Sequence, residues 1–333
     1  MSKNFKWTTE EDHDWEEIAP PPPDPVPSPR RWRRWLLLLG LVLLAGGVFV
    51  RQARQQVTAV TANVEADILS SQALLEQARN EDDLELFTTV LSGRDGRWTA
   101  AQQALFQEDL LWNRQPFGLN LLSTEPAVIS VTVTPDLQSA EMLVERQYAV
   151  SETDSPQPDG REAFLLSSPV QVDEVTLLLP LTFRKGDSRW LLSPPPDEYW
   201  GRWQQAEGRF VTLIYPERDA DIALRLLDEM DNQVKTLCRF EPAAECPGGW
   251  QLLVRLDTDP ASLTAVADPQ RLLKPDPVFD LPAPSLVGLP VDETGYEVLA
   301  QAYAGKVVNR AIVDVVANGG WHVAGDVEAA KRS

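Results

Sequence analysis

The stretch VTLLLPLTFRKGDSRWLL, residues 175–192, decides the fold of the region around it. Apolar side chains recur at every second position from Val175 to Phe183. This is the period of a strand that buries one face. Residues 185–188, KGDS, favour a tight turn, and the alternation resumes at Trp190. The stretch therefore predicts two antiparallel strands joined by a short turn.

The residues before this hairpin add strands and helices. Alternation over residues 129–133 and 142–150 predicts two more strands. Apolar residues at helical spacing from Val57 predict a long helix, residues 82–91 predict a second that stops at Gly93, and a third runs from about Trp98 to Trp112. Helices followed by an antiparallel meander of four or five strands predict an α+β domain over residues 52–200.

A second small α/β domain is predicted over residues 208–333, after the prolines at 194–196. The predicted elements are a strand at 210–215, a helix at 216–237, a strand at 250–256, a loop at 257–283, a short strand at 284–287 and a final helix at 295–316. Acidic residues in the first turn of the 216–237 helix suit the positive end of its dipole.

Residues 35–50, WLLLLGLVLLAGGVFV, carry no charge. Extended to 32–51, the run makes a helix of about 30 Å, enough to cross a hydrocarbon core. Arg33, Arg34 and Arg51 can extend their guanidinium groups to the lipid headgroups. We therefore predict a transmembrane helix at 32–51. A cleaved signal peptide and a buried core helix are the alternatives. Both are disfavoured, the first by the long acidic segment before the run and the second by the flanking arginines.

Arginines at 30, 31, 33 and 34 precede the run, and only those at 51 and 54 follow it closely. The positive-inside rule then predicts a single-pass cell-membrane protein with a cytoplasmic N-terminus and an extracytoplasmic C-terminal region. Residues 1–31 form an acidic, proline-rich tail that is predicted to be disordered. This tail is either a spacer or a short motif that binds a cytoplasmic partner.

Net charge is −20, and nearly all of it falls beyond residue 50. Such a surface repels phosphates, which excludes nucleic acid as a partner of the outer region. Apart from this exclusion, the acidity needs no explanation beyond solubility.

The order of elements in residues 52–200, closed by RWLLSPPPDEYWG at 189–201, resembles the cystatin-like and nuclear-transport-factor-like cone folds. The resemblance implies a pocket between helix and sheet, or a surface that binds a protein. Some cones are enzymes that use an Asp–His pair in this pocket. No histidine lies between His13 and His322, so that chemistry has no residue to carry it.

Residues 215–231, YPERDADIALRLLDEMD, resemble the start of the gluzincin-type zinc peptidase domains of bacterial membrane-anchored proteins. In that family a helix bearing HExxH supplies two zinc ligands and a glutamate base. The matching helix here reads VLAQAYAGKVV, at 298–308, and Gln301, Ala302 and Gly305 occupy the three key positions. The resemblance thus implies a degenerate or incomplete peptidase-like domain without its metal.

Few other residues suggest a catalytic, metal-binding or disulfide role. Cys238 and Cys246 predict a disulfide outside the cytoplasm, with two free buried thiols as the alternative. The acid pairs Asp219/Asp221 and Asp257/Asp259 suit glycoside chemistry or calcium, but such pairs are more often helix caps or turns. His322 alone lacks the partners that catalysis requires.

We therefore predict a membrane-tethered extracytoplasmic binding or sensing module without catalytic activity, cofactor or metal. Its predicted partners are the lipid bilayer and an extracytoplasmic protein or peptide. One alternative is a hydrolase of the gluzincin class, and another is a signalling regulator that acts through the cytoplasmic tail.

Overall fold

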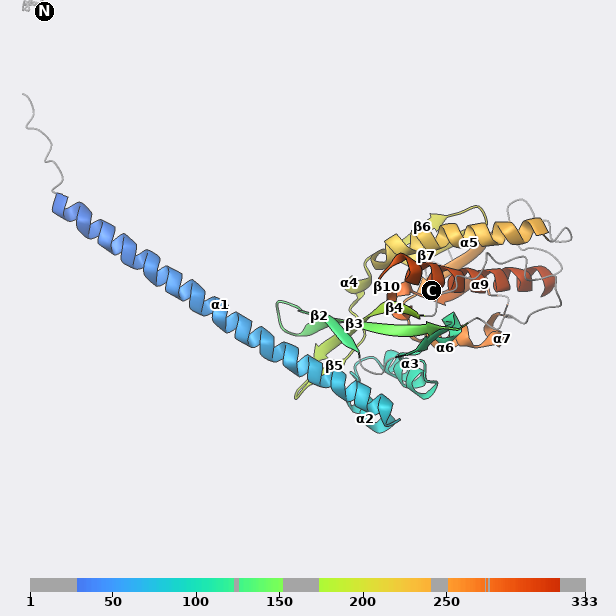
Figure 1. Cartoon of the computed structure of the whole chain (residues 1–333), viewed down its shortest axis with the longest axis horizontal. Coiled ribbons are helices and arrows are strands. Elements are labelled where there is room, and N and C mark those ends of the chain that lie inside the picture. The colour runs from blue at the N-terminus through green and yellow to red at the C-terminus, as the bar shows by residue number, and fades with distance from the viewer. Residues whose placement is uncertain are drawn as a thin grey trace, which may run out of the picture. The chain divides into compact units, whose positions relative to one another are not determined.

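A computed structural model describes residues 29–122, 126–151, 174–240, 251–272, 274 and 276–317. The chain divides into two compact units, Met1–Val60 and Thr61–Ser333. One continuous helix, α1 (Pro29–Asn80), contributes to both (Figure 1).

The N-terminal part of α1 carries large apolar side chains that lie open to solvent. They are Trp35, Leu38, Leu39, Leu41, Val42, Leu43 and Leu44. The predicted span at 32–51 lies entirely within this helix. In the part of the chain that the structure describes, however, no helix is both long and apolar enough to cross a membrane.

The second unit begins with the last turns of α1 and two short helices. Ile68, Leu75 and Ala78 of α1 are fully buried. Each short helix starts at an aspartate whose carboxylate accepts a backbone N–H in the first turn, which satisfies a donor that the helix cannot pair itself. The elements up to the end of the first sheet are α2 (Leu84–Thr89), α3 (Gly96–Gln107), η2 (Gln115–Phe117), β1 (Leu119–Leu121), β2 (Ala127–Val133), β3 (Ser139–Val150), β4 (Glu174–Lys185) and β5 (Trp190–Leu192).

The first sheet is antiparallel and follows the predicted meander. Strands β1, β3, β4 and β10 (Leu289–Pro290) lie in that order, while β2 also pairs with β3 and β5 with β4. Val144 faces Leu179 in the central pair. Inward positions alternate along both strands, as the period-2 pattern predicts. The α+β class is therefore confirmed.

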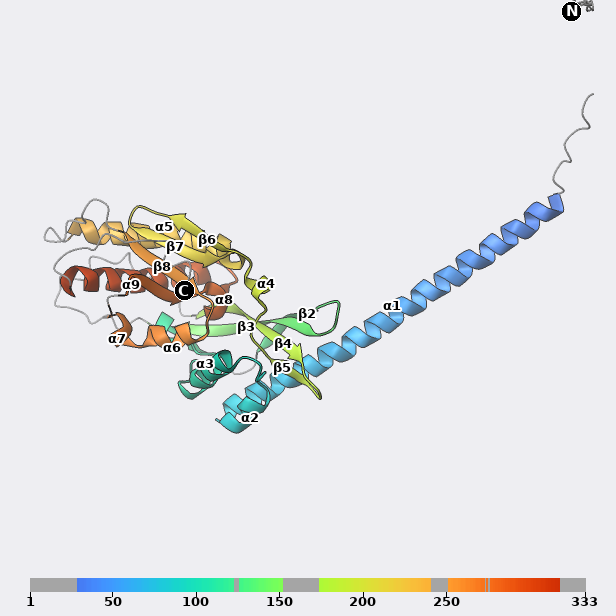
Figure 2. The same cartoon turned by 180° about the vertical axis from the view of Figure 1, so that it is seen from behind.

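The second sheet has the order β6-β7-β8-β9, with β6 antiparallel to β7 and the other three strands parallel. Helices α5 and α9 pack against each other, and α6 and α8 are seen from behind in Figure 2. The elements are α4 (Asp197–Trp200), β6 (Trp203–Glu207), β7 (Val211–Pro216), η3 (Glu217–Asp219), α5 (Ala220–Phe240), β8 (Leu252–Asp257), α6 (Ala261–Ala267), α7 (Pro269–Leu272), β9 (Val278–Pro282), α8 (Pro284–Val287) and α9 (Glu293–Ala317).

Three predictions of local structure were wrong. Residues 257–283 are not a loop, because they contain α6, α7 and β9. Residues 284–287 form the helical turn α8 and not a strand. The third helix ends at Gln107, five residues before Trp112. Proline and aspartate in these segments mark helix starts and turns here, and composition alone does not separate those from loops.

The two sheets are joined by the segment that follows β9. Strand β10 pairs with β4 of the first sheet, and Leu289 faces Leu178. Gly288, just before it, has φ +136°, and a Cβ at this residue would lie 2.9 Å from the Cβ of Leu177. Only glycine accepts both the backbone angle and the close approach.

Arg114, which follows the loop after α3, links the segment before β1 to α8. Its side chain is almost fully buried and donates only to backbone carbonyls. Nε and Nη2 donate to Val287 and Leu286 of α8, at 2.8 Å and 3.0 Å. Nη1 donates to three carbonyls of its own segment, those of residues 110, 111 and 113. One guanidinium thus holds α8 against the first sheet.

The predicted boundary between domains 52–200 and 208–333 falls inside the compact unit Thr61–Ser333. Both sheets lie in that unit, and the segment after β9 supplies β10 to the first sheet and α8 to the Arg114 contacts. The division into two domains stays a prediction.

We expect Arg114→Lys to lower the free energy of unfolding by about 2–4 kcal/mol. An ammonium group lacks the planar fork that reaches both carbonyl sets, and buried carbonyls without partners are costly. Urea unfolding measures the change. Arg189→Lys, at an exposed position, is the control and should change the value by less than about 0.5 kcal/mol. Equal stability of the two variants would refute the role of Arg114.

Cys238, near the end of α5, is disulfide-bonded. Its predicted partner Cys246 lies outside the described residues, so the pairing stays a prediction. We expect intact-mass analysis after alkylation to find both thiols blocked unless the protein is first reduced. In the chain-entropy model, a disulfide that closes so short a loop stabilises the folded protein by about 2–3 kcal/mol. Two alkylated cysteines in unreduced protein would contradict the pairing.

Candidate functional site

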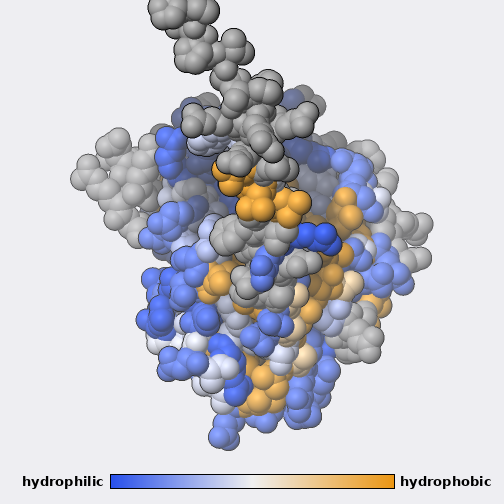
Figure 3. All heavy atoms as spheres, turned by 90° about the vertical axis from the view of Figure 1, so that its left-hand side faces the viewer, coloured by the Kyte–Doolittle hydropathy of each residue, from blue (hydrophilic) through white to orange (hydrophobic). Residues whose placement is uncertain are grey.

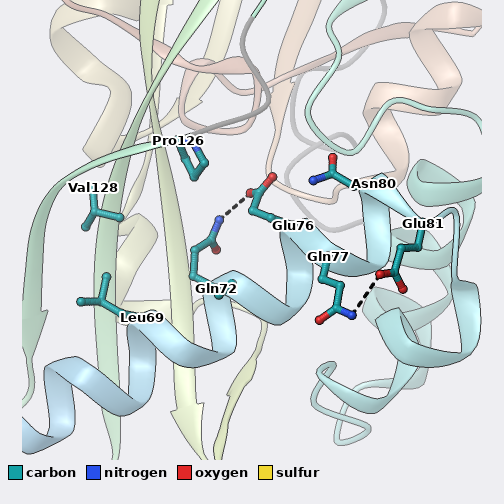
Figure 4. A pocket seen from close by; sticks show the side chains of 9 residues that line it. Leu69, Gln72, Glu76, Gln77, Asn80, Glu81, Pro126 and Val128 are labelled. Carbon is teal, nitrogen blue, oxygen red and sulfur yellow. Dashed lines mark hydrogen bonds between the residues drawn. The ribbon is translucent and has the colours of Figure 1, made fainter.

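A groove of about 530 Å³ runs along the last turns of α1, opposite the start of β2 (Figure 4). Both polar and apolar side chains line it. The lining residues are Leu69, Gln72, Ala73, Glu76, Gln77, Asn80, Glu81, Pro126 and Val128. A volume of this size is in the range of small-molecule sites. We call it the α1–β2 groove.

Two pairs of side chains four residues apart organise its polar wall. The amide Nε2 of Gln72 donates to Glu76 Oε1 at 2.7 Å, and that of Gln77 donates to Glu81 Oε1 at 3.1 Å. Residues at this spacing are neighbours on a helix surface. Because each amide uses its N–H₂ group on a carboxylate, each keeps its carbonyl oxygen free to accept.

Behind the groove, Glu76 forms an ion pair with Arg146 of β3. Arg146 occupies an inward position of the strand and lies 4.6 Å from the centroid of the Trp112 ring. Burial raises the pKa of the Glu76 carboxyl, although Arg146 opposes the rise. Burial also lowers the pKa of the Arg146 guanidinium. The pair therefore places two opposite charges in the core, and their removal from water costs free energy.

Several buried polar atoms around this pair have no hydrogen-bond partner. They are Gln72 Oε1, Glu76 Oε2, Trp112 Nε1, Arg146 Nε and Arg146 Nη1. Gln72 is 3% exposed and Glu76 is 8% exposed. Buried polar groups are nearly always paired in proteins. Such a concentration beside an open groove is what a site for a polar ligand or ordered water looks like.

The described residues that line the groove include two carboxylates, Glu76 and Glu81, and no serine, cysteine, histidine or lysine. Both apolar and polar lining residues are exposed, among them Leu69 and Glu81. Figure 3 shows one face of the molecule, on which hydrophilic and apolar patches both appear.

The sequence analysis missed this site, although two signals were present. Residues 72–81, QALLEQARNE, place a glutamine four residues before a glutamate twice. Arg146 interrupts the apolar face of an otherwise regular alternating strand. A charged residue at an inward strand position needs a buried partner.

The predicted acid pairs have separate structural roles. Asp257 Oδ1 accepts the backbone N–H of Asp259, as in a turn. Asp259 in turn accepts from the backbone of Ala261 and forms an ion pair with Arg97 at 2.8 Å. Asp221 is exposed in the first turn of α5.

Asp219, at the carboxyl end of β7, is the unusual member of these pairs. Its side chain is almost fully buried, Ser285 Oγ of α8 donates to its Oδ1, and Oδ2 has no partner. Burial raises the pKa of this carboxyl to about 6, against opposing contributions from Ser285 and Arg218. Arg218 forms an ion pair with Glu141 and lies over the ring of Tyr199.

The residues aligned with a zinc-binding motif lie in α9. Gln301, Ala302 and Gly305 are all half-buried there. Next to them, burial lowers the pKa of Lys306 to about 8, and its Nζ lies 5.4 Å from the centroid of the Phe117 ring. Over the described ranges, no three metal-ligating side chains come together.

Of the residues predicted to flank the membrane, Arg51 is exposed on α1, and Arg33 and Arg34 lie on the same helix. His322 and the tail at 1–28 lie outside the described residues. No role predicted for them is tested.

We expect Asp219→Asn to stabilise the protein at pH 7.5 by about 2–3 kcal/mol. A carboxyl whose pKa is higher in the folded state than its usual 3.8 destabilises the fold when ionised, at about 1.4 kcal/mol per pKa unit. The penalty is full above about pH 6 and disappears as the pH falls towards 4.

Urea unfolding at pH 7.5 and pH 4.5 should therefore show a gain that is about threefold larger at the higher pH. Asp221→Asn, at an exposed neighbour, should show no such difference. A gain that is the same at both pH values would mean that charge is not its cause.

Comparison with known proteins adds little. No family model and no curated protein matches the chain. Among solved structures, an NTF-2-like protein of unknown function from Shewanella oneidensis MR-1 is a weak neighbour, with 12% identity and a TM-score of 0.25. The match covers 38% of this chain and 93% of that one. At this TM-score the likeness carries no argument about function, and the gluzincin resemblance finds no relative in these comparisons.

Proposed function

We propose that this chain is a membrane-tethered, extracytoplasmic binding or sensing module without catalytic activity, and that the α1–β2 groove is its binding site. In this proposal the first sheet and α1 form a cone-like domain that presents the groove. The second sheet supports it through α8 and β10.

The observation that carries the proposal is the set of unsatisfied acceptors at the groove wall. Gln72 Oε1 and Glu76 Oε2 belong to side chains that line the groove and are more than nine-tenths buried. Each buried acceptor without a partner costs about 1–3 kcal/mol. Both atoms are buried from solvent, so a ligand reaches them after a rotation of these side chains, and one that then donates to them recovers this free energy.

The tether rests on the sequence. Residues 35–50 are uncharged, and arginines flank the run on both sides. The exposure of large side chains such as Trp35 and Leu44 agrees with it, because soluble proteins rarely leave so continuous an apolar surface in water. Bilayer contact is our explanation for this surface.

A groove-blocking variant tests the binding site. Ala73 lines the groove and is exposed, so Ala73→Trp should fill the groove without disturbing the core. Ala100→Trp, on the exposed side of α3, is the matched control. We expect saturation-transfer NMR on the full chain, with a panel of neutral, anionic and cationic fragments, to find fragments that lose binding only in Ala73→Trp.

If every fragment that binds the parent chain also binds Ala73→Trp, the groove is not the site. Circular dichroism and the thermal midpoint of each variant confirm that the tryptophan has not unfolded the chain. A variant with the parent midpoint and full binding would overturn the proposed function.

A further inference from the structure

We propose that the hydrogen bond between Asp219 and Ser285 makes the attachment of α8 and β10 depend on pH. The segment stays attached more firmly when Asp219 is protonated and detaches more often when Asp219 is ionised. This inference concerns the joint between the two sheets and is independent of the α1–β2 groove.

The segment in question, residues 283–291, runs from the end of β9 through the single turn of α8 to β10. Strand β10 in turn pairs with β4 of the first sheet. Within α8 the amides of residues 286–288 donate only to the carbonyls of residues 283 and 284. A helix of one turn has little stability of its own. Contacts with other segments therefore decide how often it detaches.

Two side chains from elsewhere in the chain hold α8. Arg114 donates to the carbonyls of Leu286 and Val287. Asp219, at the carboxyl end of β7, accepts the hydroxyl of Ser285 at its Oδ1. A guanidinium keeps its charge in proteins, whereas a carboxyl can gain or lose a proton in the range where proteins fold. Asp219 is therefore the attachment that pH can alter.

The surroundings of Asp219 supply no countercharge in contact with it. The residue is 1% exposed, and its Oδ2 has no hydrogen-bond partner. In the part of the chain that the structure describes, Asp219 belongs to no ion pair. Arg218, the residue before it, pairs with Glu141 instead. A carboxylate buried without a cation is costly, so such a group holds its proton more tightly.

Two tyrosines close enough to Asp219 to feel its charge are already engaged. Tyr303 of α9 donates its hydroxyl to the carbonyl of Pro282 at 2.6 Å. Tyr199 of α4 donates its hydroxyl to Glu141 at 3.4 Å. Burial raises the pKa of both phenols, so both stay neutral where a carboxyl titrates. Neither tyrosine therefore offsets a negative charge on Asp219.

The direction of the pH effect follows from where Asp219 is ionised. Burial raises the pKa of this carboxyl to about 6, although Ser285 and Arg218 oppose the rise. Detachment of α8 removes the Ser285 hydroxyl and lets water reach the carboxyl, so its pKa falls back towards the usual 3.8. Below about pH 4 the group is protonated in both states. Detachment becomes easier as the pH rises from there to about 6, and the effect is complete above that value.

Hydrogen exchange followed by mass spectrometry on the full chain tests this inference. Peptides that contain residues 286–288 report detachment of α8, and a peptide from β3, in the centre of the first sheet, is the internal reference. Rates at pH 5.0 and pH 7.5 are corrected for the intrinsic pH dependence of exchange. A urea series below the unfolding transition separates local detachment, which urea hardly accelerates, from global unfolding.

We expect residues 286–288 to exchange about three- to tenfold faster at pH 7.5 than at pH 5.0, with little dependence on urea. Asp219→Asn should remove this pH dependence, because the amide keeps an acceptor oxygen and cannot ionise. Asp221→Asn, at an exposed neighbour, is the matched control and should keep the parent ratio. Ser285→Ala should enlarge the ratio, because Ser285 lowers the pKa of Asp219.

Three results would overturn the inference. Equal corrected rates at the two pH values would show that ionisation does not loosen α8. The parent ratio in Asp219→Asn would assign the pH dependence to another group. A urea dependence as steep as that of the β3 peptide would show that α8 detaches only when the whole unit unfolds. If Asp219→Asn does not fold, Ser285→Ala still decides, because a ratio at or below the parent value contradicts the role of Asp219.

Discussion

The guanidinium of Arg114 is the constraint on which the arrangement of the second unit depends. It donates to carbonyls on segments about 170 residues apart, those of 110–113 and of 286–287. A one-turn helix such as α8 has almost no stability of its own, because most of its carbonyls lack an intrahelical partner. Arg114 supplies part of what is missing. Once α8 is fixed, β10 reaches β4 and Ser285 reaches Asp219.

The same unit contains a second buried cation that is satisfied much less completely. Arg146 has one carboxylate partner, and two of its nitrogens have none. Arg114, by contrast, uses all three of its nitrogens. Arg146 lies behind the α1–β2 groove, so the less completely paired of the two cations is the one next to the candidate site.

Local periodicity predicted the strands of the first sheet and the long helices, because their side chains alternate between core and solvent over many residues. It failed for 257–283 and 284–287, where elements of four to seven residues are held by contacts far away in the sequence. The site was missed for a similar reason. Glu76 and Arg146 are 70 residues apart, and although the strand pattern at Arg146 calls for a buried partner, it does not say which residue that partner is.

The inward face of α1 also sets where the chain can be shortened. Ile68, Leu75 and Ala78 are as deeply buried as any strand residue, so the last turns of this helix are part of the globular core. A version that begins after Asn80 would lose six of the nine residues that line the groove and uncover the apolar face of the first sheet. The compact unit starts at Thr61. A cut placed just before that residue retains the core and discards the exposed apolar segment.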